Sequence, residues 1–160
     1  MYEVKNVKSF IGREGYGFAC SVYKDGKKIG EALEPADGGP MNFWWTERIS
    51  EIELEAHVLT LPKFKCLDEE FDQTLDIFIT DLVEKYEFYR DLRKRCKTQW
   101  VYKTKKGAIV GYNKTLEYTK AQLEAFPSIK STILGCINDN LEGVYEWLMS
   151  QEEGKKTPLL

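Results

Sequence analysis

The chain has 160 residues, of which 42% are hydrophobic and 31% are charged, and its formal net charge is −3. This length is typical of a single domain, and so many apolar residues can bury enough surface to offset the conformational entropy of the chain, which excludes wholesale disorder. No run approaches the roughly 18 apolar residues that a membrane span needs, and the first residues lack the apolar core of a signal peptide. We therefore expect a globular, cytoplasmic protein with no membrane association.

The first 34 residues predict antiparallel strands. Asp25 and Gly26 lie between two half-apolar runs, which favours a hairpin with a type I′ turn because glycine tolerates a positive φ. If these two residues form the loop, the register that follows from them places two apolar pairs in the core. The pairs are Val22 with Ile29 and Phe18 with Leu33. An earlier strand over residues 4–11 completes a three-stranded meander.

Residues 34–40 predict a loop that ends this sheet, because two prolines and two glycines in seven residues cannot continue a strand or a helix. Trp44 and Trp45 follow shortly after it. Adjacent side chains cannot both point inward from a regular strand. One of the two rings is therefore a candidate contact for a partner or a ligand, whereas the other fits the core.

Residues 46–61 carry two competing patterns. One apolar set alternates as in a strand, and another is spaced by three and four residues, as on one face of a helix. The alternating set is Ile52, Leu54, Ala56 and Val58, and the helical set is Trp45, Ile49, Ile52, Ala56 and Leu59. We prefer a helix that Thr46 caps and that ends before Pro62, with a strand as the alternative.

The longest predicted element is an amphipathic helix from Glu69 to about Lys97. Its apolar stripe consists of Phe71, Leu75, Phe78, Leu82, Tyr86, Tyr89 and Cys96, widened by Ile79 and Val83. Acidic residues precede or enter its first turn, and basic residues crowd its last two turns. This order complements the helix dipole, so part of the pattern stabilises the helix and has no functional content.

Residues 98–114 predict a second hairpin around a turn at residues 105–107, and whether it joins the first sheet stays open. Thr119 and Gln122 predict a capping box for a short helix. A last helical pattern runs from Ile129 to Leu148, with weak points at its glycines and asparagines. Together these elements predict an α+β fold: an N-terminal antiparallel β-meander, two consecutive helices, a second β-hairpin and C-terminal helices. We expect a single domain over residues 1–150 and a mobile tail over residues 151–160.

Few side chains in this sequence could carry catalysis. The four cysteines are Cys20, Cys66, Cys96 and Cys136. They are at least 30 residues apart, so no pair has the spacing of a zinc knuckle, and we expect buried thiols. His57 is the only histidine, and its acidic surroundings predict a solvated or carboxylate-bonded ring. The carboxylates of residues 68–72 point around a helix start and do not converge. We therefore expect a non-enzymatic binding protein without a metal or a cofactor.

The charges are unevenly distributed along the chain. Residues 46–84 carry three Lys or Arg and eleven Asp or Glu, whereas residues 85–120 carry eleven and three. In the basic segment, cations that could hold phosphates interleave with rings that could stack on bases. The candidate binding residues are Arg93, Lys94, Arg95, Lys97, Trp100, Tyr102, Lys103, Lys105 and Lys106, followed by Trp44 and Trp45. The alternatives are an anionic nucleotide or nucleic acid, an acidic protein partner, or cations that only stabilise the helix end and protect the hairpin edge.

Several motifs follow one another in a recognisable order. They are the DG turn at residues 22–26, the Asp-Gly-Gly-Pro loop and aromatics at 37–45, the Thr-Leu-Pro end of an acidic helix at 60–62, the Cys-basic stretch and aromatic hairpin at 93–105, and Tyr-Thr at 118–119. This order resembles a functionally uncharacterised family of small accessory proteins encoded by phages and prophages. The resemblance implies a product that alters host physiology in the bacterial cytoplasm.

On this basis we expect an inhibitor of a bacterial anti-phage defence component. It would act by stoichiometric binding of a defence protein or by sequestration of a nucleotide signal. The alternative is a nucleic-acid-binding accessory protein in phage replication or gene regulation.

Overall fold

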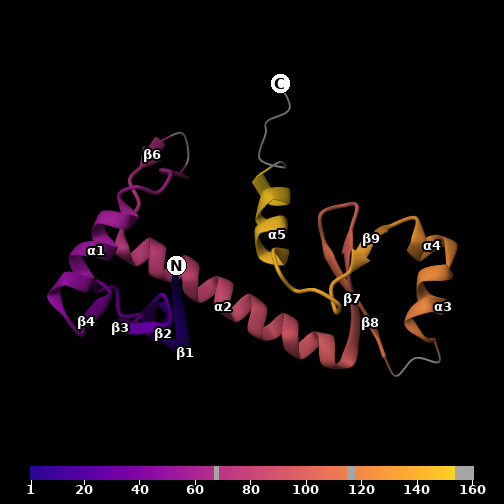
Figure 1. The fold of residues 1–160 in the computed structure, drawn as a ribbon, viewed down its shortest axis with the longest axis horizontal. Coiled ribbons are helices and arrows are strands. Elements are labelled where there is room, and N and C mark those ends of the chain that lie inside the picture. The colour runs from indigo at the N-terminus through magenta and orange to yellow at the C-terminus, as the bar shows by residue number, and fades with distance from the viewer. Residues whose placement is uncertain (67–68, 115–117, 154–160) are drawn as a thin grey trace. The chain divides into compact units, whose positions relative to one another are not determined.

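A computed structural model describes residues 1–66, 69–114 and 118–153 and shows a mixed α+β fold (Figure 1). The chain divides into two compact units, Met1–Glu87 and Phe88–Leu160, and each has its own cluster of buried side chains. The predicted fold class is confirmed. Within the described ranges, no helix is long and apolar enough to cross a membrane.

The first unit is built on an antiparallel sheet. Its strands, in sheet order, are β1 (Tyr2–Gly12), β2 (Gly15–Lys24), β3 (Lys27–Glu34) and β4 (Asn42–Trp45). Asp25 and Gly26 form the β2–β3 turn with φ values of 50° and 80°, as predicted. The expectation that residues 34–40 end the sheet is wrong, because the chain returns along the edge of β3 as β4.

The predicted β2–β3 register holds only beside the turn. A bulge between Val22 and Tyr23 shifts the pairing by one residue, so that Val22 lies opposite Gly30 instead of Ile29. A register counted from the turn cannot include the extra residue that a bulge inserts. Of the predicted core residues, Phe18, Val22 and Ile29 are buried and Leu33 is half-buried.

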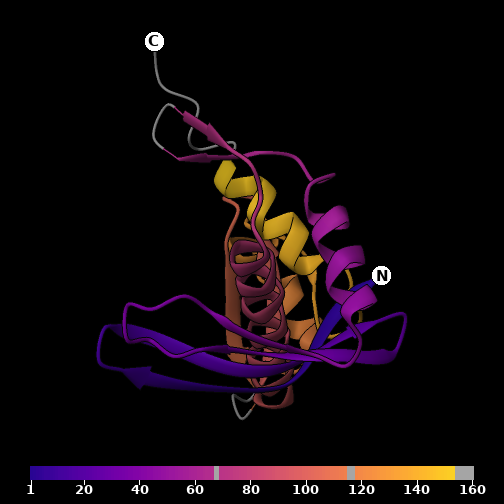
Figure 2. The same ribbon diagram turned by 90° about the vertical axis from the view of Figure 1, so that its left-hand side faces the viewer.

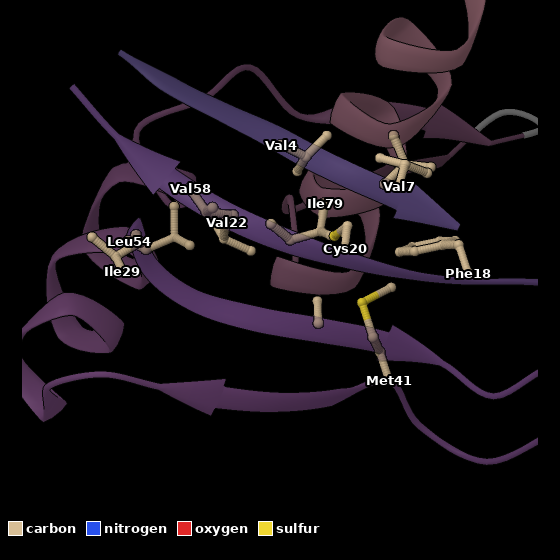
Figure 3. Close-up of a cluster of buried hydrophobic side chains, with 12 residues drawn as sticks. Val4, Val7, Phe18, Cys20, Val22, Ile29, Met41, Leu54, Val58 and Ile79 are labelled. Atoms are coloured by element: carbon tan, nitrogen blue, oxygen red, sulfur yellow. The ribbon is translucent and has the colours of Figure 1, made fainter. Parts of the chain in front are cut away.

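Two helices cover one face of this sheet. Figure 2 shows α1 (Arg48–Val58) on one side of the strands. Leu54 and Val58 of α1, together with Ile79 and Val83 of the long helix α2 (Leu75–Thr98), join the buried side chains of β1, β2 and β3 in one cluster (Figure 3). Full burial of each such side chain contributes about 1.5–3 kcal/mol, so this contact stabilises the packing of both helices on the sheet.

The interpretation of residues 46–61 as a helix is confirmed, but the predicted cap is wrong. Glu47 occupies the N-cap and makes no side-chain capping hydrogen bond. The Thr46 hydroxyl donates instead to the Ile29 carbonyl at 2.9 Å, which ties the start of α1 to β3. The Thr46 hydroxyl therefore bonds a backbone group of a distant strand and does not cap the helix.

The long helix begins later than predicted. Residues 69–71 form β6 (Glu69–Phe71), which pairs with β5 (Phe64–Cys66) in a short antiparallel ribbon. Pairing with β5 provides hydrogen-bond partners for the backbone N–H and C=O groups of these residues, so they do not need to be helical. The Thr74 hydroxyl then accepts a hydrogen bond from the Ile77 N–H at 3.3 Å and caps α2.

The second unit has a sheet of its own. Its order is β8 (Ile109–Asn113), β7 (Gln99–Thr104) and β9 (Ile133–Cys136). The second hairpin is therefore confirmed, and it does not extend the first sheet. α3 (Lys120–Ala125) begins at the predicted capping box of Thr119 and Gln122.

The helical pattern from Ile129 to Leu148 does not form one continuous helix, and part of it is a strand. α4 (Pro127–Lys130), β9 and α5 (Val144–Glu153) form there instead. β9 pairs with the edge of β7 that β8 leaves open, and this pairing satisfies backbone groups that would otherwise be unmet. Of the predicted tail, residues 151–153 belong to α5 and residues 154–160 lie outside the described residues.

Candidate binding surfaces

The predicted basic residues divide into two groups at opposite ends of β7 (Figure 1). Arg93, Lys94, Arg95 and Lys97 lie in the last turns of α2, directly before β7, and Lys105 and Lys106 lie in the turn after it. At about 3.3 Å per residue, the six residues of β7 span roughly 20 Å. The structure therefore does not gather these cations into one patch.

The aromatic side chains of β7 make contacts within the chain. Tyr102 is fully buried, and burial raises the pKa of its hydroxyl. The Lys114 Nζ lies 4.4 Å from the centroid of the Trp100 ring, and the Lys103 Nζ lies 5.0 Å from that of Trp147. Tyr102 is thus a core residue and not a contact residue, and a lysine of the same chain lies over the half-buried Trp100 ring.

Some of the predicted cations have partners within the chain. The Lys94 Nζ lies 3.3 Å from the Asp91 Oδ1, and this hydrogen bond lowers the pKa of Asp91. Arg93 lies 6.0 Å from the centroid of the Tyr89 ring. Among the described residues, no ion pair involves the exposed side chains of Arg95, Lys97, Lys105 and Lys106.

Asn138 joins the end of α2 to the second sheet. Its Nδ2 donates to the carbonyl oxygens of Cys96 and Gln99 at 2.9 and 2.8 Å, and its Oδ1 accepts from the Val101 N–H at 2.7 Å. The Lys114 Nζ also donates to the Cys96 carbonyl, at 2.6 Å. A cation at the last carbonyls of a helix is stabilising, so the charge of Lys114 has a structural role.

The two adjacent tryptophans of β4 have different environments. The Trp45 ring stacks on that of Phe43, with centroids 5.4 Å apart and planes at 7°, and it lies against Gly30 of β3. Trp44 is 54% exposed. The inference that the two rings do not both point inward is confirmed, and Trp44 is the ring that a ligand or partner can reach.

The helical apolar set of α1 faces solvent. Ile49, Ile52 and Leu59 are 53, 50 and 72% exposed, and Ala56 is exposed as well. These residues, spaced at i, i+3, i+7 and i+10, form a stripe along one side of the helix. We call them the α1 stripe.

A shallow groove lies beside the α1 stripe, with Ala56 in its lining. The His57 ring lies 4.8 Å from that of Tyr2 and 5.7 Å from that of Phe78 between ring centroids. His57 therefore packs against aromatic rings and is half-buried, which corrects the expectation of a solvated or carboxylate-bonded side chain.

Sequence reasoning did not identify the α1 stripe as a surface, although a signal was present. The strand-like alternation through Leu54 and Val58 competes with the helical set in the same segment. In a helix, these two patterns place apolar residues on opposite sides, and only one side can pack on the sheet. Two apolar sides on one short helix thus indicate a second contact.

Comparisons with protein-family models, curated proteins and solved structures found no match. Within the part of the chain that the structure describes, no three His, Cys, Asp or Glu side chains are grouped to hold a metal ion. Cys20 is a buried free thiol, and Cys96 and Cys136 are half-buried free thiols. The Cys66 side chain lies outside the described residues. Among the described residues, the α1 stripe, the area around Trp44 and the two groups of cations are surfaces that a partner can reach.

Proposed function

We propose that this protein is a non-enzymatic accessory protein that inhibits a bacterial anti-phage defence protein by stoichiometric binding, with the α1 stripe as the contact. The observation that carries the proposal is the exposure of at least half of the Ile49, Ile52 and Leu59 side chains. Amphipathic helices with anchors at this spacing bind in hydrophobic grooves of partner proteins. The phage setting is supported by the order of sequence motifs described above.

The α1 stripe can supply a useful part of the binding free energy. Full burial of an Ile or Leu side chain contributes about 1.5–3 kcal/mol, and half or more of each of the three large side chains is still exposed. Covering them therefore contributes roughly 3–5 kcal/mol, or at least a hundredfold in Kd. A tight complex needs further contacts around the stripe.

The residues beside the α1 stripe favour a groove with a basic rim. Glu51 and Glu55 take part in no ion pair among the described residues. Glu53, on the other flank, lies 2.6 Å from the Lys24 Nζ. Because Arg48 is the only Lys or Arg of α1, the helix presents a net negative surface to a partner.

Two isoleucine variants test the proposal. Ile52→Glu places a charge in the centre of the α1 stripe, and Ile11→Glu places one on β1, where the native side chain is 81% exposed. Tagged wild type captures its partner from bacterial lysate, and the purified partner is then titrated with wild type and with each variant. We expect wild type and Ile11→Glu to inhibit the partner at a 1:1 ratio and Ile52→Glu to bind at least a hundredfold more weakly. Equal binding by Ile52→Glu would overturn the proposal.

A nucleic-acid-binding accessory protein in phage replication or gene regulation is a second candidate, and the cations without ion pairs favour it. Arg95 and Lys97 at one end of β7, and Lys105 and Lys106 at the other, could neutralise phosphates of one duplex. Binding to duplex DNA should then weaken steeply as salt concentration rises and should fall in the Lys105→Glu/Lys106→Glu variant. Binding that depends on neither salt nor these lysines argues against this candidate.

A further inference from the structure

The face of the first sheet that points away from α1 carries a trough. Strand register aligns two rows of residues across β1, β2, β3 and β4 in that order, namely Lys5, Ser21, Glu31 and Trp44, and Lys8, Ala19, Leu33 and Asn42. In both rows the residue on β2 is small, and larger side chains stand on the outer strands. A hollow of about 510 Å³ lies over the small residues, a size within the roughly 300–1,000 Å³ of small-molecule sites. We call it the sheet trough.

The lining of the sheet trough contains a hydroxyl without a partner. Ser21 is only 7% exposed, and no hydrogen bond of its hydroxyl occurs among the described residues. Its chain neighbours Cys20 and Val22 belong to the core cluster on the opposite side of the sheet. A hydroxyl can donate one hydrogen bond and accept two, so the Ser21 hydroxyl is suited to bond a group that enters the trough.

A β-bulge builds one end of the sheet trough. The β1 register breaks between Lys5 and Lys8, and Asn6 adopts a φ of 56°. Such bulges re-aim side chains and are frequent beside functional sites. Lys5 is engaged by Glu3 at 3.0 Å and lies 4.6 Å from the centroid of the Tyr23 ring. Lys8 is exposed and takes part in no ion pair among the described residues, so it is the cation available at this end.

The other end of the sheet trough offers a flat ring and a carboxylate. Trp44 is more than half exposed, and Glu31 lies directly opposite it on β3. The Lys28 Nζ donates to the Glu31 Oε1 at 2.5 Å. Within the described chain, the Glu31 Oε2 has no hydrogen-bond donor, so it can accept a hydrogen bond from a group stacked on Trp44.

We propose that the sheet trough binds a guanine nucleotide, with the base stacked on Trp44 and the phosphate at Lys8. An exposed indole stacks on any base, and a lysine neutralises a phosphate. Guanine carries an exocyclic amino donor and a neighbouring ring N–H, which suit the carboxylate of Glu31. The outer strands are three spacings of about 4.8 Å apart, or roughly 14 Å, which leaves room for a base, a sugar and a phosphate in line across the sheet.

The sugar would then lie over Ser21, whose hydroxyl can bond one of its hydroxyl groups. This site is separate from the α1 stripe, because α1 packs on the opposite face of the sheet. The nucleotide proposal can therefore fail or succeed independently of the proposed protein partner.

Calorimetric titration of the full chain with GMP, AMP and inorganic phosphate tests the site. We expect GMP to bind more tightly than AMP, and phosphate alone at least tenfold more weakly than GMP. Trp44→Ala and Lys8→Glu should each weaken GMP binding at least tenfold, and Ser21→Ala severalfold. Matched controls in the second unit are Tyr118→Ala, which removes an exposed ring, and Lys130→Glu, which reverses an exposed cation.

The result supports the site if both controls, and Ile52→Glu in the α1 stripe, bind GMP like wild type. Circular dichroism confirms that each variant is folded. Equal GMP binding by Trp44→Ala, phosphate binding as tight as that of GMP, or no GMP binding at millimolar concentration overturns the nucleotide site. Equal affinity for AMP and GMP overturns the assignment of guanine.

Discussion

Gly30 is a position at which the first sheet has no room for a side chain. A Cβ built there lies 2.6 Å from the Trp45 Cε3 and 2.8 Å from the carbonyl oxygen of Trp44. The Trp45 ring is held by its stacking on Phe43, and the oxygen belongs to the backbone of β4. Relief of the clash therefore requires β4 to move away from β3. Overpacking of this kind costs about 1–3 kcal/mol, and we expect Gly30→Ala to lose that much stability.

Urea unfolding, followed by tryptophan fluorescence and by amide exchange in β3, measures this loss. Gly135→Ala in β9 is the control, because a Cβ there meets nothing within 4 Å and its φ is outside the left-handed region. We expect this control to be neutral or stabilising by up to about 1 kcal/mol, since alanine reduces the entropy of the unfolded chain. Wild-type stability of Gly30→Ala would refute the close packing of β4 on β3.

Three further outcomes follow from single contacts. Asn138→Ala removes three hydrogen bonds at the α2–β7 junction. It should lower the free energy of unfolding of the second unit by about 2–3 kcal/mol, measured by urea unfolding. An unchanged unfolding midpoint would show that these hydrogen bonds do not contribute to stability. Thr119→Ala removes the N-cap of α3 and should destabilise that helix by about 1 kcal/mol. Amide hydrogens of α3 should then exchange faster than in wild type, and equal exchange rates would contradict the capping role of Thr119. Burial raises the pKa of Cys20 to about 11, above the ordinary thiol value of 9.0, so the stability that the neutral thiol contributes is complete below pH 9 and is lost as pH rises toward 11. Wild type should accordingly lose more unfolding free energy than Cys20→Ala between pH 8 and 11, and parallel losses would exclude this linkage.

The two proposed sites lie on opposite faces of the first sheet. A protein partner on the α1 stripe and a nucleotide in the sheet trough would therefore not compete for the same side chains. A nucleotide that changes the affinity for the protein partner would have to act through the core strands between them, and the coupling would be equal in both directions.

The sequence predicts that only one of Trp44 and Trp45 points inward, but not which one. It also does not show which aromatic residues of the basic segment are buried, because burial depends on elements distant in the chain. Adjacent side chains of a strand point to opposite faces, so the two tryptophans cannot both point inward, whatever elements surround them. Tyr102 and Val101 are adjacent on β7 and both buried, because β7 is the central strand of its sheet and is covered on both faces. A hairpin without its third strand leaves one edge of β7 open, and β9, which closes that edge, was not predicted.

The local sequence predicts features whose energy lies within a few consecutive residues, namely the turn at Asp25 and Gly26, the capping box at Thr119 and the second hairpin. It also predicts α2, whereas it leaves the segment of α1 open between a helix and a strand. The tertiary structure decided which side of α1 is buried, where the β2–β3 register shifts, and that residues 133–136 pair with β7 instead of continuing a helix. An apolar pattern indicates which residues can be buried together. It does not indicate which surface covers them or which strand edge is open for pairing, because these belong to elements distant in the chain.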